Sequence, residues 1–266
     1  MRLPPRLSVS AICTLGWDLE RDLAYWRSAG IGHVGVSVAK LRAAGWDRAV
    51  SRVAGAGLQV SNLIGPGPFT LWDRSAWDGQ RRRLEEMLEA AAAMSAGCLV
   101  VTTGPSGSLE WEEAADRLEE AMAPVLAGGP PVPVALEHTN SLRPDIGFLH
   151  TLRDAVELAR RLGIGVCMET NACWLERGLA GTVAEGVGVI RLVQLSDYVI
   201  GTTRTPDRAV PGDGDIPLGR IVSQLLGAGY SGPFDLELVG PAIEAEGYES
   251  AIARSVEALS SLLPES

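Results

Sequence analysis

The sequence alternates between short apolar runs and longer amphipathic segments, and it does so eight times. Runs such as CLVV and IGVCM are apolar at nearly every position, which is typical of strands buried on both faces of a parallel sheet. We therefore expect eight parallel strands, at Leu7–Cys13, His33–Val38, Leu58–Ile64, Cys98–Thr102, Val132–His138, Ile164–Glu169, Ile190–Leu195 and Phe234–Val239.

The segments between these runs have helical periodicity. Asp18 is expected to cap one helix and Gly30 to end it, in keeping with the residue preferences at the two helix ends. The clearest helices are expected at Asp18–Ser28, Trp77–Met94, Trp111–Leu126, Phe148–Leu162, Leu218–Leu226 and Ser250–Leu262. Eight strand–helix units in 266 residues average about 33 residues each, the spacing of a (β/α)8 TIM barrel. A doubly wound α/β sheet is the alternative, but it usually has fewer strands and a glycine-rich first turn.

No Ser/Gly-rich tract divides the chain, so residues 1–266 are expected to form a single domain. The net charge of −10 argues against a nucleic-acid partner. The longest apolar runs fall well short of the roughly 18 residues of a membrane span, and the first residues lack the pattern of a signal peptide. We therefore expect a cytoplasmic protein with a small-molecule substrate, no nucleic acid and no membrane partner; a homodimer is an open alternative.

The cysteine and lysine content limits the kinds of catalytic chemistry that the chain can support. The four cysteines form no CxxC pair and are expected to be reduced core thiols. Lys40 is the only lysine, so Schiff-base chemistry has one available nucleophile. We expect Lys40 at an exposed helix start; the alternative is a position at the barrel mouth. Motifs of P-loop, α/β-hydrolase and zincin sites do not occur.

Four consecutive strands end in polar residues, namely Glu137, Glu169, Gln194 and Glu237. In a TIM barrel the strand ends meet at one mouth, where the active site lies. Three carboxylates at close range repel one another, and burying them unpaired is costly. A divalent cation is the simplest compensation, and an all-oxygen ligand set favours Mn²⁺ or Mg²⁺. The alternative is a set of solvated or ion-paired acids.

The segments SVSAICTLGWDLERDL, AGLQVSNLIGPG, DRAVPGDGDIPLGRI and GAGYSGPFDLELV resemble the xylose isomerase-like TIM barrel superfamily of sugar phosphate isomerases and epimerases. The resemblance extends over nearly the whole chain. It implies one divalent metal held at the last four strand ends by Glu, Asp, His (sometimes Gln) and Glu. Glu137 and Glu237 match this pattern as ligands and as an acid/base pair. Gln194 occupies the histidine position, as in the dehydroshikimate dehydratases.

The chain departs from the pattern of this family at three positions. Glu169 stands where the family usually has Asp, and it is one methylene longer. Ala172 replaces a histidine that often contacts the substrate, and Arg143 replaces an acid. The polar contacts to a sugar are therefore expected to differ from those of the family.

The residues expected to contact the substrate are His138, Asn140, Arg143, Asn171, Arg208 and Trp174. Arg208 matches an arginine that in relatives extends toward the substrate or metal; the alternative is a salt bridge with Asp207 or Asp213. The alternative for His138 is that its side chain points into the helix layer, because side chains alternate along a strand. The alternatives for Trp174, Trp72 and Trp77 are to line the substrate site or to pack between the helices and the barrel.

The chemistry implied by the resemblance is proton abstraction beside a carbonyl. In an isomerase or epimerase of a hydroxy-carbonyl compound, one glutamate removes the proton and the other returns it, through a metal-stabilised enediolate. Departure of a β-hydroxyl from the same enolate would instead make the protein a lyase of the dehydroshikimate dehydratase type. A barrel with altered or lost catalysis that serves as a binding subunit is the third hypothesis.

Overall fold

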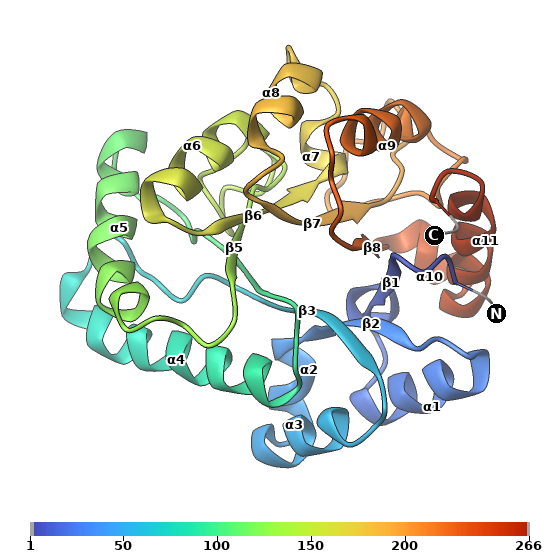
Figure 1. The fold of residues 1–266 in the computed structure, drawn as a ribbon, viewed down its shortest axis with the longest axis horizontal. Helices are drawn as coiled ribbons and strands as arrows, with labels where there is room; N and C mark the ends of the chain where they lie inside the picture. The colour runs from blue at the N-terminus through green and yellow to red at the C-terminus, as the bar shows by residue number, and fades with distance from the viewer. Residues whose placement is uncertain (1–2, 265–266) are drawn as a thin grey trace.

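In the computed structural model, which describes residues 3–264, parallel strands close into a barrel in chain order (Figure 1). The predicted (β/α)8 TIM barrel is confirmed. The strands are β1 (Leu7–Ser10), β2 (His33–Ser37), β3 (Gln59–Gly65), β4 (Leu99–Thr102), β5 (Val134–Glu137), β6 (Gly165–Glu169), β7 (Ile190–Leu195) and β8 (Phe234–Leu236). The first strand is shorter than predicted because the chain turns into the 3-10 helix η1 (Ala11–Thr14).

The helices surround the barrel and include all six that the sequence predicts. They are α1 (Leu19–Ala29), α2 (Val38–Ala43), α3 (Trp46–Ala54), α4 (Trp77–Ala93), α5 (Trp111–Ala127), α6 (Leu152–Leu162), α7 (Thr170–Cys173), α8 (Leu179–Gly186), α9 (Leu218–Gly227), α10 (Pro241–Glu246) and α11 (Tyr248–Ser260), with a 3-10 turn η2 (Arg74–Ala76). The five that the sequence did not single out are α2, α3, α7, α8 and α10. Each has nine residues or fewer, too few for a clear helical period.

The predicted ends of α1 are confirmed. The carboxylate of Asp18 accepts a hydrogen bond from the backbone N–H of Arg21 at 2.8 Å, and Gly30 ends the helix in the left-handed conformation with φ of 71°. Helix α6 begins later than predicted, at Leu152, because the hydroxyl of Thr151 caps it by accepting from the N–H of Asp154 at 3.0 Å.

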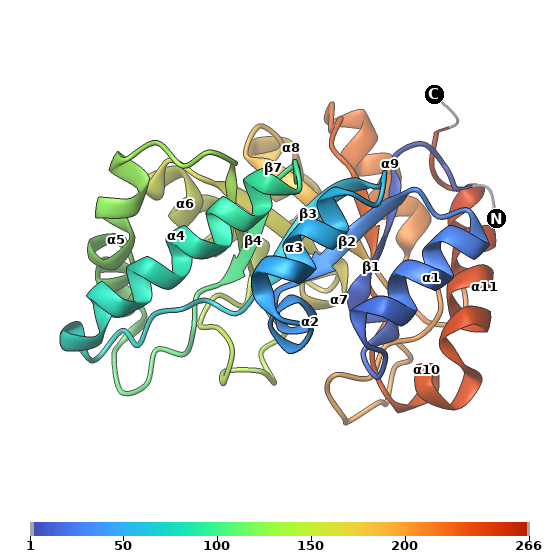
Figure 2. The same ribbon diagram turned by 90° about the horizontal axis from the view of Figure 1, so that it is seen from below.

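The alternation of strand side chains builds both the core and the mouth of the barrel. One face of the strands packs against the helices in the main hydrophobic cluster. The other face forms a smaller cluster of Cys98, Val100, Ala135, Cys167 and Leu192. Two residues further along their strands, the same inward face carries the polar side chains of the predicted site. The loops that follow the strands project together from the lower end of the barrel in Figure 2, and the β7–α9 loop, in orange, extends furthest.

All four cysteines are buried free thiols, as predicted. The expectation of an exposed Lys40 is wrong. Its ammonium is buried and donates to Oδ2 of Asp22 at 2.6 Å, to the carbonyl of Thr14 at 2.8 Å and to the hydroxyl of Thr14 at 3.0 Å. These bonds join α1, α2 and η1 at the mouth end of the barrel. Among the described residues no helix is long and apolar enough to cross a membrane.

Candidate functional site

The four strand-end residues of the sequence analysis meet at the mouth of the barrel. Glu137 and Glu169 are the last residues of β5 and β6, Gln194 is the last but one of β7, and Glu237 directly follows β8. All four side chains are buried. Carboxylate oxygens of the three glutamates lie within 4.8 Å of one another, so the predicted carboxylate cluster forms.

Arg208 provides the positive charge next to this cluster. Its two terminal nitrogens contact different carboxylates: Nη2 forms an ion pair with Oε2 of Glu169, and Nη1 lies 3.0 Å from Oε1 of Glu237. Nη1 also donates to the backbone carbonyl of Glu237 at 3.0 Å. Burial alone would lower the pKa of Arg208, but the surrounding carboxylates raise it above its ordinary value. The guanidinium therefore keeps its positive charge in the site.

The predicted alternative for Arg208, a salt bridge with Asp207 or Asp213, is not what the structure shows. Asp213 pairs with Arg254 at 2.7 Å. The backbone of Arg208 is held against the strand-end of β8, because its N–H donates to the carbonyl of Val239 at 2.9 Å. The β7–α9 loop is thus fastened where it brings the guanidinium to the cluster.

Gln194 presents its amide nitrogen, rather than its oxygen, to the cluster. Nε2 donates to Oε2 of Glu237, and Oε1 accepts from the thiol of Cys167 at 3.2 Å. The backbone carbonyl of Gln194 accepts from the hydroxyl of Thr170 at 2.9 Å. Amide oxygen and nitrogen are distinguished only by their partners. A half-turn of the amide would place Oε1 toward the carboxylates and leave Nε2 to donate to the sulfur.

The two glutamates predicted as the acid/base pair are the ones whose proton affinity is raised. Burial raises the pKa of Glu137 well above its usual range, and the charges of Glu237 and Glu169 add to this effect. Burial also raises the pKa of Glu237, although Arg208 opposes it. Among the described residues, the carboxylate of Glu137 has no hydrogen-bond or ion-pair partner. A raised pKa brings a carboxyl group closer to the working range of a general acid or base.

The donor set also fits a divalent cation. Three converging carboxylates supply the oxygen ligands that Mg²⁺ and Mn²⁺ prefer, and their combined charge exceeds that of the single arginine beside them. Glu169, one methylene longer than the expected Asp, is steadied at Oε1 by the backbone N–H of Asn171 at 2.9 Å. Glu137, Glu169 and Glu237 are the residues that would hold the ion, with Gln194 joining through its oxygen after the half-turn.

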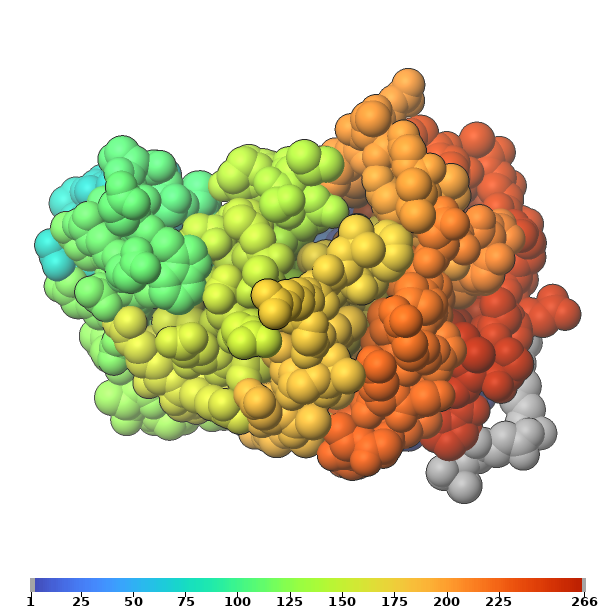
Figure 3. Space-filling model, turned by 90° about the horizontal axis from the view of Figure 1, so that it is seen from above, coloured from blue at the N-terminus to red at the C-terminus, as the bar shows by residue number. Residues whose placement is uncertain are grey.

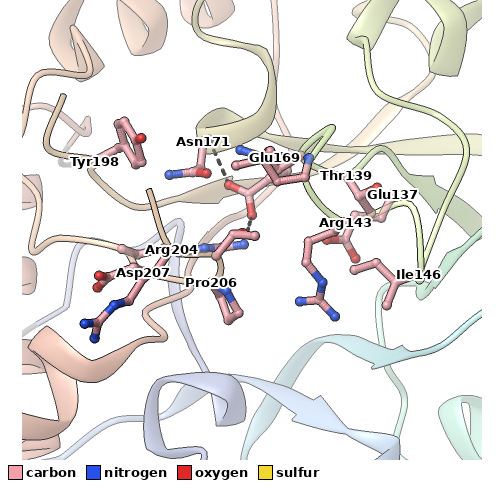
Figure 4. Close-up of a pocket in the computed structure, with 14 residues that line it drawn as sticks. Glu137, Thr139, Arg143, Ile146, Glu169, Asn171, Tyr198, Arg204, Pro206 and Asp207 are labelled. Atoms are coloured by element: carbon pink, nitrogen blue, oxygen red, sulfur yellow. Dashed lines mark hydrogen bonds and ion pairs between the residues drawn. The ribbon is translucent and has the colours of Figure 1, made fainter. Parts of the chain in front are cut away.

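A cavity of about 60 Å³, partly open to solvent, is lined by Glu137 and Glu169 of the carboxylate cluster. Figure 4 shows Glu169 between Asn171 and the loop that carries Pro206 and Asp207, with Glu137 and Arg143 to one side. In Figure 3 the β7–α9 loop, in orange, projects at the upper edge of the molecule. The lining residues are Glu137, Thr139, Asn140, Leu142, Arg143, Ile146, Glu169, Asn171, Tyr198, Arg204, Thr205, Pro206, Asp207 and Arg208.

Four of the predicted substrate contacts, Asn140, Arg143, Asn171 and Arg208, line this cavity. Asn140 uses its side-chain oxygen to accept from the N–H of Leu142 at 2.9 Å. Arg143 forms two hydrogen bonds with Asp145, at 2.9 and 2.8 Å. Both side chains are therefore held in place by their own loop.

Two predicted contacts lie outside the lining residues. His138 is fully buried, and its Nε2 accepts from the backbone N–H of Glu169 at 3.2 Å. Burial lowers the pKa of His138 to about 3, so the ring is neutral; the helix-layer alternative describes it better than a substrate contact. Trp174 packs, half-buried, against the main core. Trp77 is also a core residue, with Nε1 donating to the carbonyl of Thr70 at 3.0 Å, and Trp72 packs against Gly107.

The sequence reasoning missed several residues of the cavity. Thr139 is two positions after Glu137, so the same alternation that brings the glutamate to the mouth also places Thr139 there. Tyr198, Arg204 and Pro206 lie on the β7–α9 loop, where no periodic pattern gives a signal.

Comparison with known proteins agrees with this architecture. A sequence model of the family described as xylose isomerase-like TIM barrel matches residues 23–262. No curated protein sequence matches the chain. Among solved structures, protein SMc04130 from Sinorhizobium meliloti 1021 has a TM-score of 0.86 and 24% sequence identity, covering 97% of this chain and 98% of its own.

Two further similar structures have more informative descriptions. The IolI protein with a bound zinc atom has a TM-score of 0.80 and 18% identity, with 97% of this chain and 98% of that chain covered. D-Psicose 3-epimerase with D-tagatose from Clostridium cellulolyticum H10 has a TM-score of 0.73 and 14% identity, with 96% and 97% covered. At these identities the likeness shows a shared fold.

Proposed function

This chain belongs to the xylose isomerase-like TIM barrel family, and from its carboxylate cluster we propose that it is a divalent-metal-dependent isomerase or epimerase acting on a hydroxy-carbonyl, sugar-like small molecule. The observation that carries the proposal is the pairing of Glu137 with Glu237. Both are buried, both have a raised pKa, and both belong to the carboxylate cluster at the barrel mouth, of which Glu137 and Glu169 line the cavity.

The two glutamates have unequal surroundings, and this suits two different roles. Arg208 is paired with Glu237 and favours its ionised form, so Glu237 would take the proton from the carbon beside the carbonyl. Glu137 has no cationic partner among the described residues, and burial favours its protonated form, so Glu137 would supply the proton that is returned. Return to the same carbon from the other face inverts it, whereas return to the neighbouring carbon, with the hydroxyl proton moving from one oxygen to the other, gives aldose–ketose isomerisation.

A bound divalent cation would polarise the carbonyl and stabilise the negative charge that develops on its oxygen. We propose Mn²⁺ or Mg²⁺, because the ligands are oxygens. Zn²⁺ belongs in the same test, because the IolI structure contains zinc. Asn140, Arg143 and Asn171 are proposed to bind the hydroxyl groups of the substrate.

Hydrogen exchange in D₂O tests the proposal. The purified protein is incubated with Mn²⁺ and a panel of keto-sugars and other hydroxy-carbonyl compounds, and deuterium beside the carbonyl is followed by mass spectrometry. We expect uptake with the wild type and losses of at least a hundredfold in Glu137→Gln and Glu237→Gln. Glu112→Gln, at an exposed residue of α5, is the matched control. If no compound takes up deuterium and no compound loses water, the proposal is contradicted.

Gln194 favours a second candidate, because the dehydroshikimate dehydratases that the chain resembles carry glutamine at this position. Dehydration would use the same proton abstraction but lose a β-hydroxyl as water. Including dehydroshikimate in the panel separates the two reactions, since a lyase gives a product lighter by one water. A binding subunit without catalysis would bind no stoichiometric metal and would keep its stability in Glu137→Ala and Glu237→Ala.

A further inference from the structure

Every carboxylate oxygen of Glu169 and Glu237 already has a partner. In Glu169, Oε1 accepts from the backbone N–H of Asn171 and Oε2 contacts Nη2 of Arg208. In Glu237, Oε1 lies 3.0 Å from Nη1 of Arg208, and Oε2 accepts from Nε2 of Gln194. Each of these oxygens keeps a further lone pair, but a cation that ligated both glutamates would lie beside the guanidinium of Arg208, which contacts them both.

The three partners differ in their freedom to move. The N–H of Asn171 belongs to the backbone of α7. The amide of Gln194 is fully buried and held at its other end by Cys167. The guanidinium of Arg208, in contrast, borders the cavity on one side and sits at the end of a long side chain. Arg208 is therefore the partner with space to move into.

The backbone of Arg208 does not have this freedom. Its N–H is bonded to the carbonyl of Val239 at 2.9 Å. The next residue, Ala209, exchanges two backbone hydrogen bonds with Asp197, at 2.8 and 3.0 Å. Movement is thereby confined to the side chain, which would swing from the carboxylates into the cavity without rearranging the loop.

We propose that Arg208 is an internal counter-ion that occupies the place of the divalent cation, and that metal binding displaces its guanidinium from Glu169 into the cavity. The inference rests on the proposed function, since it takes the same carboxylates as metal ligands. Its physical basis is that a guanidinium and a dication repel each other when both contact the same carboxylates. Arg208 would thus keep the carboxylates paired in the absence of metal and lower the affinity of the site for metal.

The test is a titration of the purified, EDTA-treated protein with Mn²⁺ alone, in which free Mn²⁺ is measured by its electron paramagnetic resonance signal. We expect Arg208→Gln to bind Mn²⁺ at least tenfold more tightly than the wild type. Arg204→Gln is the matched control, because Arg204 lines the same cavity and has no ion pair with any residue between 3 and 264. Its affinity is expected to stay within twofold of the wild type.

Thermal unfolding gives a second readout. Without metal, Arg208→Gln should melt below the wild type, because the carboxylates lose their counter-ion; with saturating Mn²⁺ the difference should shrink. Equal or weaker Mn²⁺ binding by a folded Arg208→Gln variant would overturn the inference while leaving the proposed function intact. Mn²⁺ binding by the variant but not by the wild type would support the inference and contradict the proposed metal dependence of the native protein.

If Arg208→Gln fails to fold, the wild type itself decides the question. In a crystal structure of the Mn²⁺-loaded wild type, Nη2 of Arg208 is expected to lie beyond the roughly 4 Å of an ion pair from both oxygens of Glu169. A guanidinium that stays in contact with Glu169 beside the bound metal would overturn the inference.

Discussion

The ring of His138 accepts a hydrogen bond through Nε2 from the backbone N–H of Glu169, at 3.2 Å. His138 directly follows β5, and Glu169 ends the neighbouring strand β6. With a pKa of about 3, the ring is neutral throughout the physiological range and carries its proton on Nδ1. We therefore expect His138 to act on the site through Glu169, as a positioning residue, rather than as an acid, a base or a ligand.

His138→Ala is expected to lower the affinity for Mn²⁺ about tenfold, because loss of a group that orients a metal ligand typically costs 10–100-fold. His138→Asn, which keeps an acceptor near the same place, should restore part of the affinity. Because the ring does not titrate near neutral pH, the ratio of wild-type to variant affinity should be the same at pH 6 and pH 8. A ratio that changes across this range would contradict the positioning role.

The strand pattern was sufficient to predict the barrel and the convergence of Glu137, Glu169, Gln194 and Glu237. Strand period and strand order together determine which side chains face the mouth. The partner of the cluster was not predictable in the same way. Arg208 lies on a loop without periodicity, and the sequence offered its near neighbours Asp207 and Asp213 as equally good partners. Only the closure of the chain brings it to Glu169 and Glu237.

Lys40 shows the same limit in a helix. The sequence predicts an exposed Lys40, because a helix start is usually exposed and no nearby residue indicates that η1 and α1 cover it. Its partner Asp22 lies in α1, 18 positions earlier in the sequence. Burial lowers the pKa of Lys40 and raises that of Asp22 to about 6. Burial thus disfavours the charged form of both residues, and their ion pair opposes this effect.

Lys40→Met is expected to destabilise the protein by about 3–5 kcal/mol, since it leaves the carboxylate of Asp22 buried without its partner. The double variant Lys40→Met/Asp22→Leu should recover most of this loss, because both charges are then gone. Urea unfolding followed by circular dichroism measures both. Additive effects of the two substitutions would show that the pair is not energetically coupled.

Asp235 predicts a further dependence of the stability on pH. It is fully buried in β8, where burial raises its pKa to about 7 against the opposing hydrogen bonds of Ser8 and Asn62. Its ordinary pKa in an unfolded chain is about 3.9. Between these values the folded protein holds a proton that the unfolded chain has lost, so the free energy of unfolding falls as the pH rises from about 4 to about 7.

Asp235→Asn should remove this contribution. At pH 8, in EDTA, the variant is expected to be more stable than the wild type by a few kcal/mol, at about 1.4 kcal/mol per unit of pKa shift, and the difference should vanish toward pH 4. Asp47→Asn, at an exposed position of α3, is the control. Equal pH profiles for the wild type and Asp235→Asn would show that Asp235 ionises normally in the folded protein.

Gly35 of β2 leaves the space that Asp235 and Asn62 occupy. A Cβ added there would lie 2.9 Å from Nδ2 of Asn62 and 3.0 and 3.1 Å from the two oxygens of Asp235, so Gly35→Ala overpacks the barrel interior. We expect it to destabilise the protein by about 1–3 kcal/mol, measured by urea unfolding at pH 7. Gly32→Ala is the matched control, because a Cβ at Gly32 meets nothing within 4 Å. If both alanines cost the same, the loss comes from the backbone and not from contact with Asn62 and Asp235.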